Sequence, residues 1–466
     1  MYLAAVVCLT LLALYVIALR MFRDPLANLR FTASSLDSLP LRVPGGFLWG
    51  TATSAHQVEG GCTNNNWYAF EASPALSGRP RILEGQRAGN AADHWNRYRD
   101  DIRLMKDLGL NAYRFSVEWS KIEPLEGTFD ENAIAHYSDV LRELRAAGIT
   151  PMVTLHHFTN PLWFEEHGAF LRDDAPEIFG RFVRKVIRSL GETVGLWMTL
   201  NEPTVYALNG YLFGEFPPGV KVPKQAVRVL RNVLRAHAEA YRIIKEELSQ
   251  AQVGLGMNFF VFDPRFPYHL IDVLSARFST RSTNETLLRF LRDGRFTFGI
   301  PGIGYESYRS DSRESFDFIG LNYYTRFRTR LRPFSGMTED RGESAPPQAR
   351  TDMGWEIYPE GLFRALAVIR SFTDRPVYIT ENGIADEGDT KRASFIENHL
   401  LVMNRAIAEG IDIRGYFYWS LLDNFEWAFG FSKRFGLYHV DFKTQMRTLR
   451  NGSKAYPDMI RKFQPR

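Results

Sequence analysis

The chain has 466 residues, of which 45% are hydrophobic and 24% are charged, and its formal net charge is +4. A net charge this small, without a basic run interleaved with aromatic residues, excludes the charged surface that a nucleic-acid partner requires. The two cysteines, Cys8 and Cys62, provide neither a disulfide framework nor a zinc site.

The N-terminal segment from Met1 to Leu19 is apolar and carries no charged side chain. As a helix it would span about 28 Å, close to the hydrocarbon thickness of a bilayer. Arg20 and Arg23 follow the apolar run, whereas a signal peptide carries its basic residues before it. The pattern therefore favours an uncleaved membrane anchor over residues 1–20, with the catalytic domain in the cytoplasm. A cleaved signal peptide that exports the protein and a mis-annotated start are the alternatives.

Residues 21–43 mix proline, serine, aspartate and arginine with little apolar periodicity, which predicts a linker. The alternation of strand-like and helix-like stretches begins directly after it. We therefore expect one catalytic domain over residues 44–466.

Short apolar runs alternate with amphipathic stretches from Gly46 onward. Eight runs have the length and composition of buried parallel strands: 47–53, 112–117, 151–155, 197–200, 253–259, 316–322, 377–380 and 415–419. Helical periodicity covers intervening stretches such as 94–108, 133–146 and 226–248. This order predicts an α/β fold, a single (β/α)8 TIM barrel. A doubly wound sheet is the alternative, but no glycine-rich phosphate-binding turn follows the first strand.

Two of the predicted strands end in a glutamate. Glu202 follows the run Leu196–Leu200, and Glu381 follows the run Val377–Thr380. Because the carboxyl ends of barrel strands meet on one face, the two carboxylates can flank one sugar, as a two-carboxylate glycosidase requires. The alternative is that each glutamate is a capping or ion-pair residue at the barrel rim.

Other polar and aromatic residues also collect at these strand ends. They are Gln57, Glu59, Arg114, His156, His157, Asn201, Asn322, Tyr323, Tyr324, Asn382 and Trp419. Two long insertions, 263–312 and 333–353, are expected to form a rim or lid above the site. No cluster of histidine, cysteine and aspartate indicates a metal, and we expect no cofactor.

Six sequence blocks, in this order, resemble those of glycoside hydrolase family 1, the retaining β-glycosidases. They read FLWGTATSAHQVEG, YRFSVEWSKIEP, TLNEP, GLNYYT, YITENG and YWSLLDNFEWAFGFSKRFGLYHVDF. The resemblance covers residues 44 to 457 and depends on all six blocks together. The chain departs from the family where His157 is followed by Phe-Thr-Asn-Pro instead of Trp-Asp-Leu-Pro, and over residues 263–312.

The resemblance implies a role for each matching residue. Glu202 would be the general acid/base and Glu381 the nucleophile. The residues expected to bind the sugar are Gln57, His157, Asn201, Trp419, Glu426 and Trp427. Arg114 and Tyr324 would lie beside the nucleophile with Asn322 in support, and Trp355 would line the aglycone side. Glu426 would also disfavour 6-phospho-sugars by charge repulsion.

The chemistry requires Glu202 to hold its proton near neutral pH, and burial beside the negative Glu381 would raise its pKa. We therefore expect hydrolysis of a small-molecule β-glycoside or a glycolipid whose sugar is glucose, galactose or fucose. One alternative is a membrane-anchored transglycosylase that transfers the sugar to a glycolipid or sugar acceptor. The other is a sugar-binding protein without catalytic activity.

Overall fold

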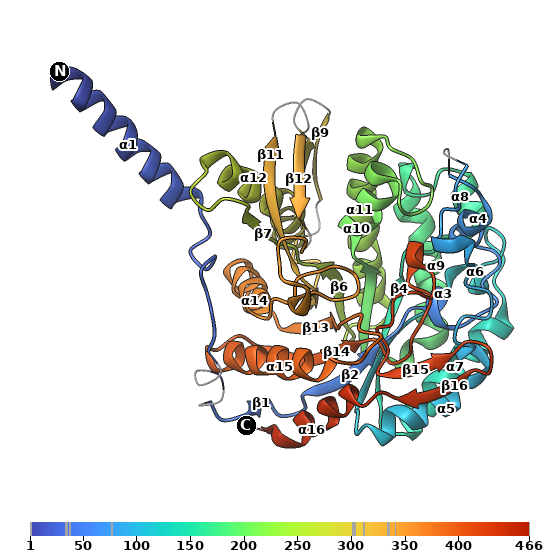
Figure 1. Cartoon of the computed structure of the whole chain (residues 1–466). Coiled ribbons are helices and arrows are strands. Elements are labelled where there is room, and N and C mark those ends of the chain that lie inside the picture. The colour runs from blue at the N-terminus through green and yellow to red at the C-terminus, as the bar shows by residue number, and fades with distance from the viewer. Residues whose placement is uncertain are drawn as a thin grey trace.

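Eight parallel strands close into a barrel in the computed structural model, in the order β10-β13-β14-β2-β3-β4-β5-β6 (Figure 1). The strands are β2 (Leu48–Ala52), β3 (Ala112–Ser116), β4 (Thr150–His156), β5 (Leu196–Asn201), β6 (Gln252–Asn258), β10 (Phe318–Asn322), β13 (Val377–Asn382) and β14 (Ile413–Trp419). Each overlaps one of the eight strands predicted from the sequence, so the predicted (β/α)8 barrel is confirmed.

The structure describes residues 2–32, 36, 39–75, 78–300, 304–310, 313–332, 336–340 and 342–465. Within these ranges the side chains at 3–5, 300, 304, 332, 336–339, 464 and 465 are not described. Parts of the predicted linker and of both predicted insertions, including residues 301–303 of the glycine-rich run 299–304, lie outside the described residues.

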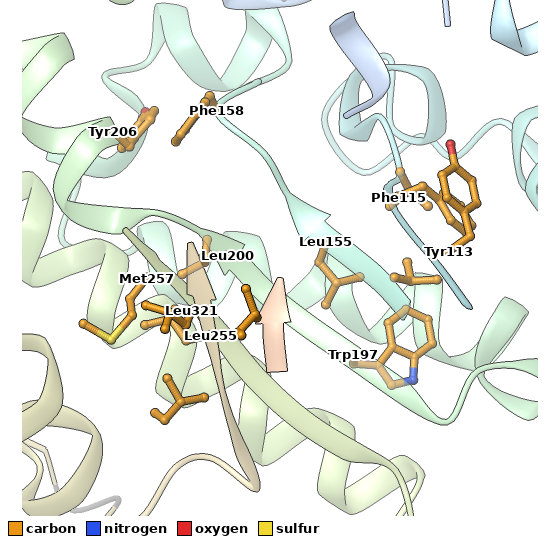
Figure 2. Packing of buried hydrophobic residues seen from close by; sticks show 14 of the residues in the cluster. Tyr113, Phe115, Leu155, Phe158, Trp197, Leu200, Tyr206, Leu255, Met257 and Leu321 are labelled. Carbon is orange, nitrogen blue, oxygen red and sulfur yellow. The ribbon is translucent and has the colours of Figure 1, made fainter. Parts of the chain in front are cut away.

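The strands alternate between two buried environments, as the period of two in a β-strand requires. Met152, Met198, Phe318 and Phe417 belong to a cluster that fills the barrel. The intervening side chains, such as Leu155, Trp197, Leu200 and Leu255, pack outward in the larger core (Figure 2). Every residue of β3, β5, β10 and β13 is buried, which explains why these strands are mostly apolar in the sequence.

Helices surround the barrel (Figure 1). The longer ones are α5 (His94–Asp107), α7 (Glu131–Ala146), α9 (Ala175–Leu190), α11 (Pro223–Glu247), α13 (Thr286–Asp293), α14 (Glu360–Phe372), α15 (Arg392–Ala408) and α16 (Ala455–Lys462). Shorter helices follow several strands: α3 (Ala55–Val58), α4 (Asn66–Ala72), α6 (Trp119–Ile122), α8 (Leu162–Glu166) and α10 (Pro203–Leu208).

The small sheets lie outside the barrel. One contains β7 (Val261–Pro264), β11 (Arg326–Arg332) and β12 (Gly336–Asp340), in the order β12-β11-β7, and we call it the rim sheet. It lies beside α12 (Leu270–Thr280) in the upper part of Figure 1. The others pair β1 (Arg42–Val43) with β17 (Gln464–Pro465), β8 (Arg295–Ile300) with β9 (Gly304–Arg309), and β15 (Tyr438–Asp441) with β16 (Met446–Leu449).

The N-terminal segment forms α1 (Tyr2–Phe22), which projects from the barrel beside α12 (Figure 1). Asp24, in the segment predicted to be a linker, pairs with Arg364 of α14 at 2.6 Å. Phe31 packs against Phe363 of the same helix, with ring centroids 5.5 Å apart. Among the described residues, no helix is both long enough and apolar enough to cross a membrane, so the structure does not support the predicted transmembrane helix.

Candidate active site

A cavity of about 340 Å³ opens at the carboxyl ends of the barrel strands. Both predicted catalytic residues line this cavity. Glu202 directly follows β5, and Glu381 is the second-to-last residue of β13. Other predicted site residues that line it are His157, Asn201, Tyr324, Trp355, Trp419, Glu426 and Trp427. Residues more than 170 positions apart in the sequence therefore face one space, as the barrel prediction requires.

Both oxygens of the Glu381 carboxylate have a hydrogen-bond donor. Arg114 of β3 donates from Nη1 to Oε1 at 2.5 Å, and the Tyr324 hydroxyl donates to Oε2 at 2.7 Å. Arg114 is 1% exposed and Glu381 4% exposed, so the ion pair is shielded from water. These contacts fix the orientation of the carboxylate and compensate the charge that β13 brings into the cavity.

Glu202 lies in the left-handed backbone region, with φ 46°, between the end of β5 and the start of α10. Asn322, which ends β10, donates from Nδ2 to Oε1 of Glu202 at 2.7 Å. Burial and the negative charge of Glu381 raise the pKa of Glu202 to about 8. Glu202 therefore holds its proton at neutral pH while its neighbour is placed to act as a base or nucleophile.

Asn201 connects the surroundings of the two carboxyl groups. Its Oδ1 accepts from Arg114 Nη2 at 2.6 Å and from Asn322 Nδ2 at 3.1 Å. Asn322 in turn accepts from the Thr380 hydroxyl at 2.7 Å. Side chains from β3, β5, β10 and β13 thus form one buried network, which holds Glu202 and Glu381 in a defined relation to each other.

The predicted sugar-binding side carries both polar and aromatic groups. Gln57 is buried and donates to the Phe425 carbonyl oxygen at 2.9 Å and to Oε2 of Glu426 at 3.4 Å. Burial and the charge of Glu381 raise the pKa of Glu426 to about 8. Trp419, 3% exposed, and Trp427, 6% exposed, line the same end of the cavity.

His157 is neutral at physiological pH, because burial and the charge of Arg114 hold its pKa well below the usual value. Its Nε2 lies 3.0 Å from Nδ2 of Asn201. Its Nδ1 is buried and has no partner among the described residues. The preceding residue, His156, instead bonds to Asn160 at 2.9 Å and does not line the cavity.

Glu59 shows where the strand-end prediction does not hold. It follows β2 and α3, but it pairs with Lys121 at 2.8 Å and accepts from the Tyr137 hydroxyl at 2.8 Å. It does not line the cavity that contains Glu202. Nearby, the rings of Trp95 and His136 stack with their centroids 3.7 Å apart.

The sequence reasoning missed many of the residues that line the cavity, and five of them matter for the argument below. They are Phe213, Asn258, Phe260, Phe262 and Phe327. Asn258 ends β6 as Asn201 ends β5, so the same strand-end rule could have found it. Phe260 and Phe262 are two positions apart, the spacing of side chains that share one face of a strand. Among the described residues, no group of three or more histidine, cysteine or acidic side chains could hold a metal ion.

The sequence model of glycosyl hydrolase family 1 matches residues 40–464. The chain belongs to glycosyl hydrolase family 1. It is therefore a glycoside hydrolase, and the resemblance to this family is confirmed. The match spans the barrel, the rim sheet and both candidate catalytic residues.

Several similar proteins match this chain over nearly their whole length. Beta-glucosidase A of Thermotoga maritima is 34% identical over 451 residues, which cover 90% of this chain and 98% of that protein. A 1,4-beta-D-glucan glucohydrolase of Thermotoga neapolitana is 33% identical, with the same coverage. The solved structure of a beta-glycosidase from Pyrococcus horikoshii superimposes with a TM-score of 0.83 at 39% identity and covers 91% of this chain and 96% of that chain.

Proposed function

We propose that this family 1 enzyme hydrolyses β-D-glucosides with retention of configuration, with Glu381 as the nucleophile and Glu202 as the acid/base. The observation that carries the proposal is the single hydrogen-bond network that joins Glu202 and Glu381 at one cavity. Three similar proteins bear names that support a glucoside substrate, two called beta-glucosidase A and one called 1,4-beta-D-glucan glucohydrolase. Residues 44–466 would form the catalytic domain.

In the first half-reaction, an Oε atom of Glu381 attacks the anomeric carbon while Glu202 gives its proton to the leaving glycosidic oxygen. A bond forms between the sugar and Glu381, and the aglycone departs as an alcohol. The raised pKa of Glu202 suits this step, because the residue is protonated in the free enzyme. Tyr324 and Arg114 hold the attacking carboxylate in place.

In the second half-reaction, water attacks the same carbon from the face that the aglycone left. Esterification removes the negative charge of Glu381, which is one of the causes that raise the pKa of Glu202. Glu202 therefore becomes more acidic and accepts the proton of the attacking water. The sugar is released with its original β configuration, and both carboxyl groups return to their first state.

The sugar itself would be held at the inner end of the cavity. Trp419 presents an apolar ring, and Glu426 and Gln57 lie close enough to share one hydroxyl. His157 offers its free Nδ1 as a further hydrogen-bond partner. This set can accept glucose, galactose or fucose, and the names of the similar proteins favour glucose.

Proton NMR of a hydrolysis reaction tests the proposal directly. With 4-nitrophenyl β-D-glucoside, the first sugar product should be β-D-glucose, and the α anomer should appear only later by mutarotation. Release of α-D-glucose first, or full activity in the Glu381→Ala variant, would contradict the assignment. The same assay with the galactoside and the fucoside ranks the three sugars.

Free monosaccharide as the main product would also separate hydrolysis from transfer. The similar enzymes named above are glucosidases and a glucohydrolase, which favours water over a sugar or glycolipid acceptor. Chromatography of products formed with and without an added glycolipid acceptor measures the ratio of the two reactions.

A second proposal concerns localisation: α1 and the exposed side of α12 bind a lipid bilayer. Exposed apolar residues of α1 include Val6, Val7, Leu9, Leu11, Leu12, Leu14 and Ile17. They lie on all sides of the helix, whereas docking on a protein would need only one stripe. Ile271, Leu274 and Phe278 add exposed apolar side chains on α12, next to α1.

Flotation with phosphatidylcholine vesicles tests this binding. The full chain should rise with the vesicles, whereas a variant without residues 2–22 should remain below or bind weakly through α12. A full chain that stays below with the unbound protein would refute bilayer binding. The hydrolysis assay is unaffected by that result, so the two proposals are tested separately.

A further inference from the structure

Apart from the residues assigned to the sugar and to the reaction, the active-site cavity is lined mainly by apolar side chains, and we call this part of the lining its outer half. They are Val205, Leu208, Phe213, Phe216, Phe260, Phe262, Phe327, Met353, Trp355, Phe429 and Phe435. The predicted sugar-binding residues account for the rest of the lining, so this apolar surface is the part left to contact the group that departs from the sugar. Its composition therefore bears on the choice of aglycone.

Three phenylalanines form one aromatic wall on the side of the rim sheet. The ring centroids of Phe260 and Phe262 are 5.9 Å apart, those of Phe260 and Phe327 are 5.4 Å apart, and those of Phe262 and Phe327 are 5.7 Å apart. Phe262 of β7 and Phe327 of β11 are direct partners in the sheet register. Ala276 of α12 belongs to the same buried cluster as Phe262 and Phe327, and Phe260 packs against this cluster.

The position of these strands explains why the wall reaches the cavity. Only two residues separate the end of β6 from the start of β7, and only three separate the end of β10 from the start of β11. Both strands of the rim sheet therefore begin close to the rim of the barrel. Figure 1 shows β7 and β11 together above β6. The wall is thus fixed directly to the strands that carry Asn258 and Asn322.

The opposite side of the opening is also apolar. Val205 and Leu208 of α10 are partly exposed, and Phe213 is 42% exposed. A phenyl ring left this exposed beside a cavity gains free energy when an apolar group covers it. An occupant that reaches from Phe260 to Phe213 would be covered on two sides.

Few polar side chains in the outer half are available to a second sugar. Those lining it are Asn209, Glu215, Asn258 and Thr283. The Thr283 hydroxyl already donates to the Ser279 carbonyl oxygen at 2.8 Å, and Asn258 supports Glu202 through a hydrogen bond. A sugar aglycone brings several hydroxyl groups, and each one that leaves water without a partner weakens binding.

We propose that the outer cavity selects an apolar aglycone, an alkyl chain or an aryl group, over a second sugar. The inference rests on the proposed hydrolysis of β-D-glucosides and adds the class of leaving group. Phe260, Phe262 and Phe327 form the selecting surface, and Phe213 lines the same cavity from the segment after α10. The proximity of this surface to α12 suits amphiphilic substrates.

A series of substrates with one sugar and different aglycones tests the proposal in the full-length enzyme. The value of kcat/KM should rise from methyl to butyl to octyl β-D-glucoside, by roughly two- to fourfold for each methylene that the cavity covers. Octyl β-D-glucoside, kept below its micelle-forming concentration, should be a better substrate than cellobiose. Equal kcat/KM along the alkyl series, or a preference for cellobiose, would overturn the proposal.

Variants then identify the surface responsible. Phe260→Ala should lower kcat/KM for the octyl glucoside at least tenfold more than for the methyl glucoside. Phe266→Ala is the matched control, because Phe266 lies a short distance further along the chain, is 50% exposed and does not line the cavity. Phe213→Ser, on the exposed side, provides a second variant that does not disturb the core. Equal losses on both substrates for Phe260→Ala and Phe213→Ser would contradict the role of this wall.

The outcomes separate this inference from the proposed function. An enzyme that cleaves no β-D-glucoside, including the nitrophenyl compound, would refute the proposed function. An enzyme that cleaves methyl and octyl glucosides equally well would refute only the inference about the aglycone.

Discussion

Arg114 and Glu381 form a buried ion pair across the mouth of the barrel, with 2.5 Å between Nη1 and Oε1. The arginine comes from β3 and the glutamate from β13, and β14 and β2 lie between these strands in the barrel. The same guanidinium also donates to Asn201 and to the Thr380 carbonyl oxygen. One side chain thus compensates the charge of the proposed nucleophile and links it to the strand that carries Glu202.

Replacing Arg114 should damage both stability and activity. Arg114→Met leaves the Glu381 carboxylate buried without its ion-pair partner, and breaking such a pair costs about 3–5 kcal/mol of unfolding free energy. Chemical denaturation measures this loss. Arg142→Met is the control, because the Arg142–Asp139 pair is exposed and such pairs contribute less than about 1 kcal/mol. Similar stability losses in the two variants would contradict the role assigned to Arg114.

The role of Glu202 as the acid predicts a dependence on the leaving group. Glu202→Gln should lose roughly 10²–10⁴-fold in kcat/KM on methyl β-D-glucoside, whose leaving group needs a proton. The loss should be far smaller on 2,4-dinitrophenyl β-D-glucoside, which departs without protonation. Steady-state kinetics on both substrates checks this difference, with Glu192→Gln at the opposite, exposed end of β5 as the control. Equal losses on the two substrates would exclude Glu202 as the acid.

The role of Glu381 as the nucleophile predicts chemical rescue. Glu381→Ala removes the attacking oxygen and opens space beside Arg114, so turnover of β-D-glucosides should stop. Added azide can occupy that space and attack the anomeric carbon directly, which produces the α-glucosyl azide of inverted configuration. NMR of the product identifies it. A variant that retains turnover without azide would show that another group acts as the nucleophile.

Much of the fold could be predicted, because each buried strand has a continuous apolar run in the sequence. β5 and β13 are fully buried, and their runs end at the residues that begin the active site. The placement of α1 beside α12 could not be predicted, because it depends on contacts such as that of Tyr15 with the Tyr268 carbonyl oxygen, which are far apart in the sequence. The same holds for the pairing of Asp24 with Arg364.

In the candidate site, too, some residues could be predicted from the sequence and others could not. Glu202 and Glu381 lie at strand ends and line the cavity, and Asn322, which ends β10, donates a hydrogen bond to Glu202. Glu59 also follows a predicted strand in the sequence but is turned by α3 toward Lys121 and away from the site. The phenylalanine wall was missed, because Phe262 and Phe327 become neighbours only through the pairing of β7 with β11.

The pKa of Glu202 predicts the alkaline side of the pH profile. Since the pKa is about 8 in the free enzyme, Glu202 is protonated below that pH and loses its proton above it. The value of kcat/KM should therefore fall as pH rises through about 8, because the deprotonated residue cannot donate a proton to the leaving group. Initial rates from pH 5 to pH 10 measure this.

The variant Glu202→Gln provides the control for this profile. With the dinitrophenyl substrate, which needs no acid, the fall attributed to Glu202 should disappear. If the fall near pH 8 persists unchanged in this variant, another group controls the alkaline side, and Glu426 is then the first candidate because its pKa is also about 8.

Glu426 should make the enzyme less stable as pH rises. Burial raises its pKa from 4.5 to about 8 in the folded state, so between these values the folded chain binds a proton that the unfolded chain has lost. The free energy of unfolding therefore falls with increasing pH, by at most about 1.4 kcal/mol for each pH unit. Glu426→Gln keeps the shape of the side chain but does not titrate. Its stability relative to the natural enzyme should increase from pH 5 to pH 8 and level off above that. Chemical denaturation at pH 5, 6.5, 8 and 9 measures the difference, and a constant or shrinking difference would show that Glu426 is ionised in the folded enzyme at neutral pH.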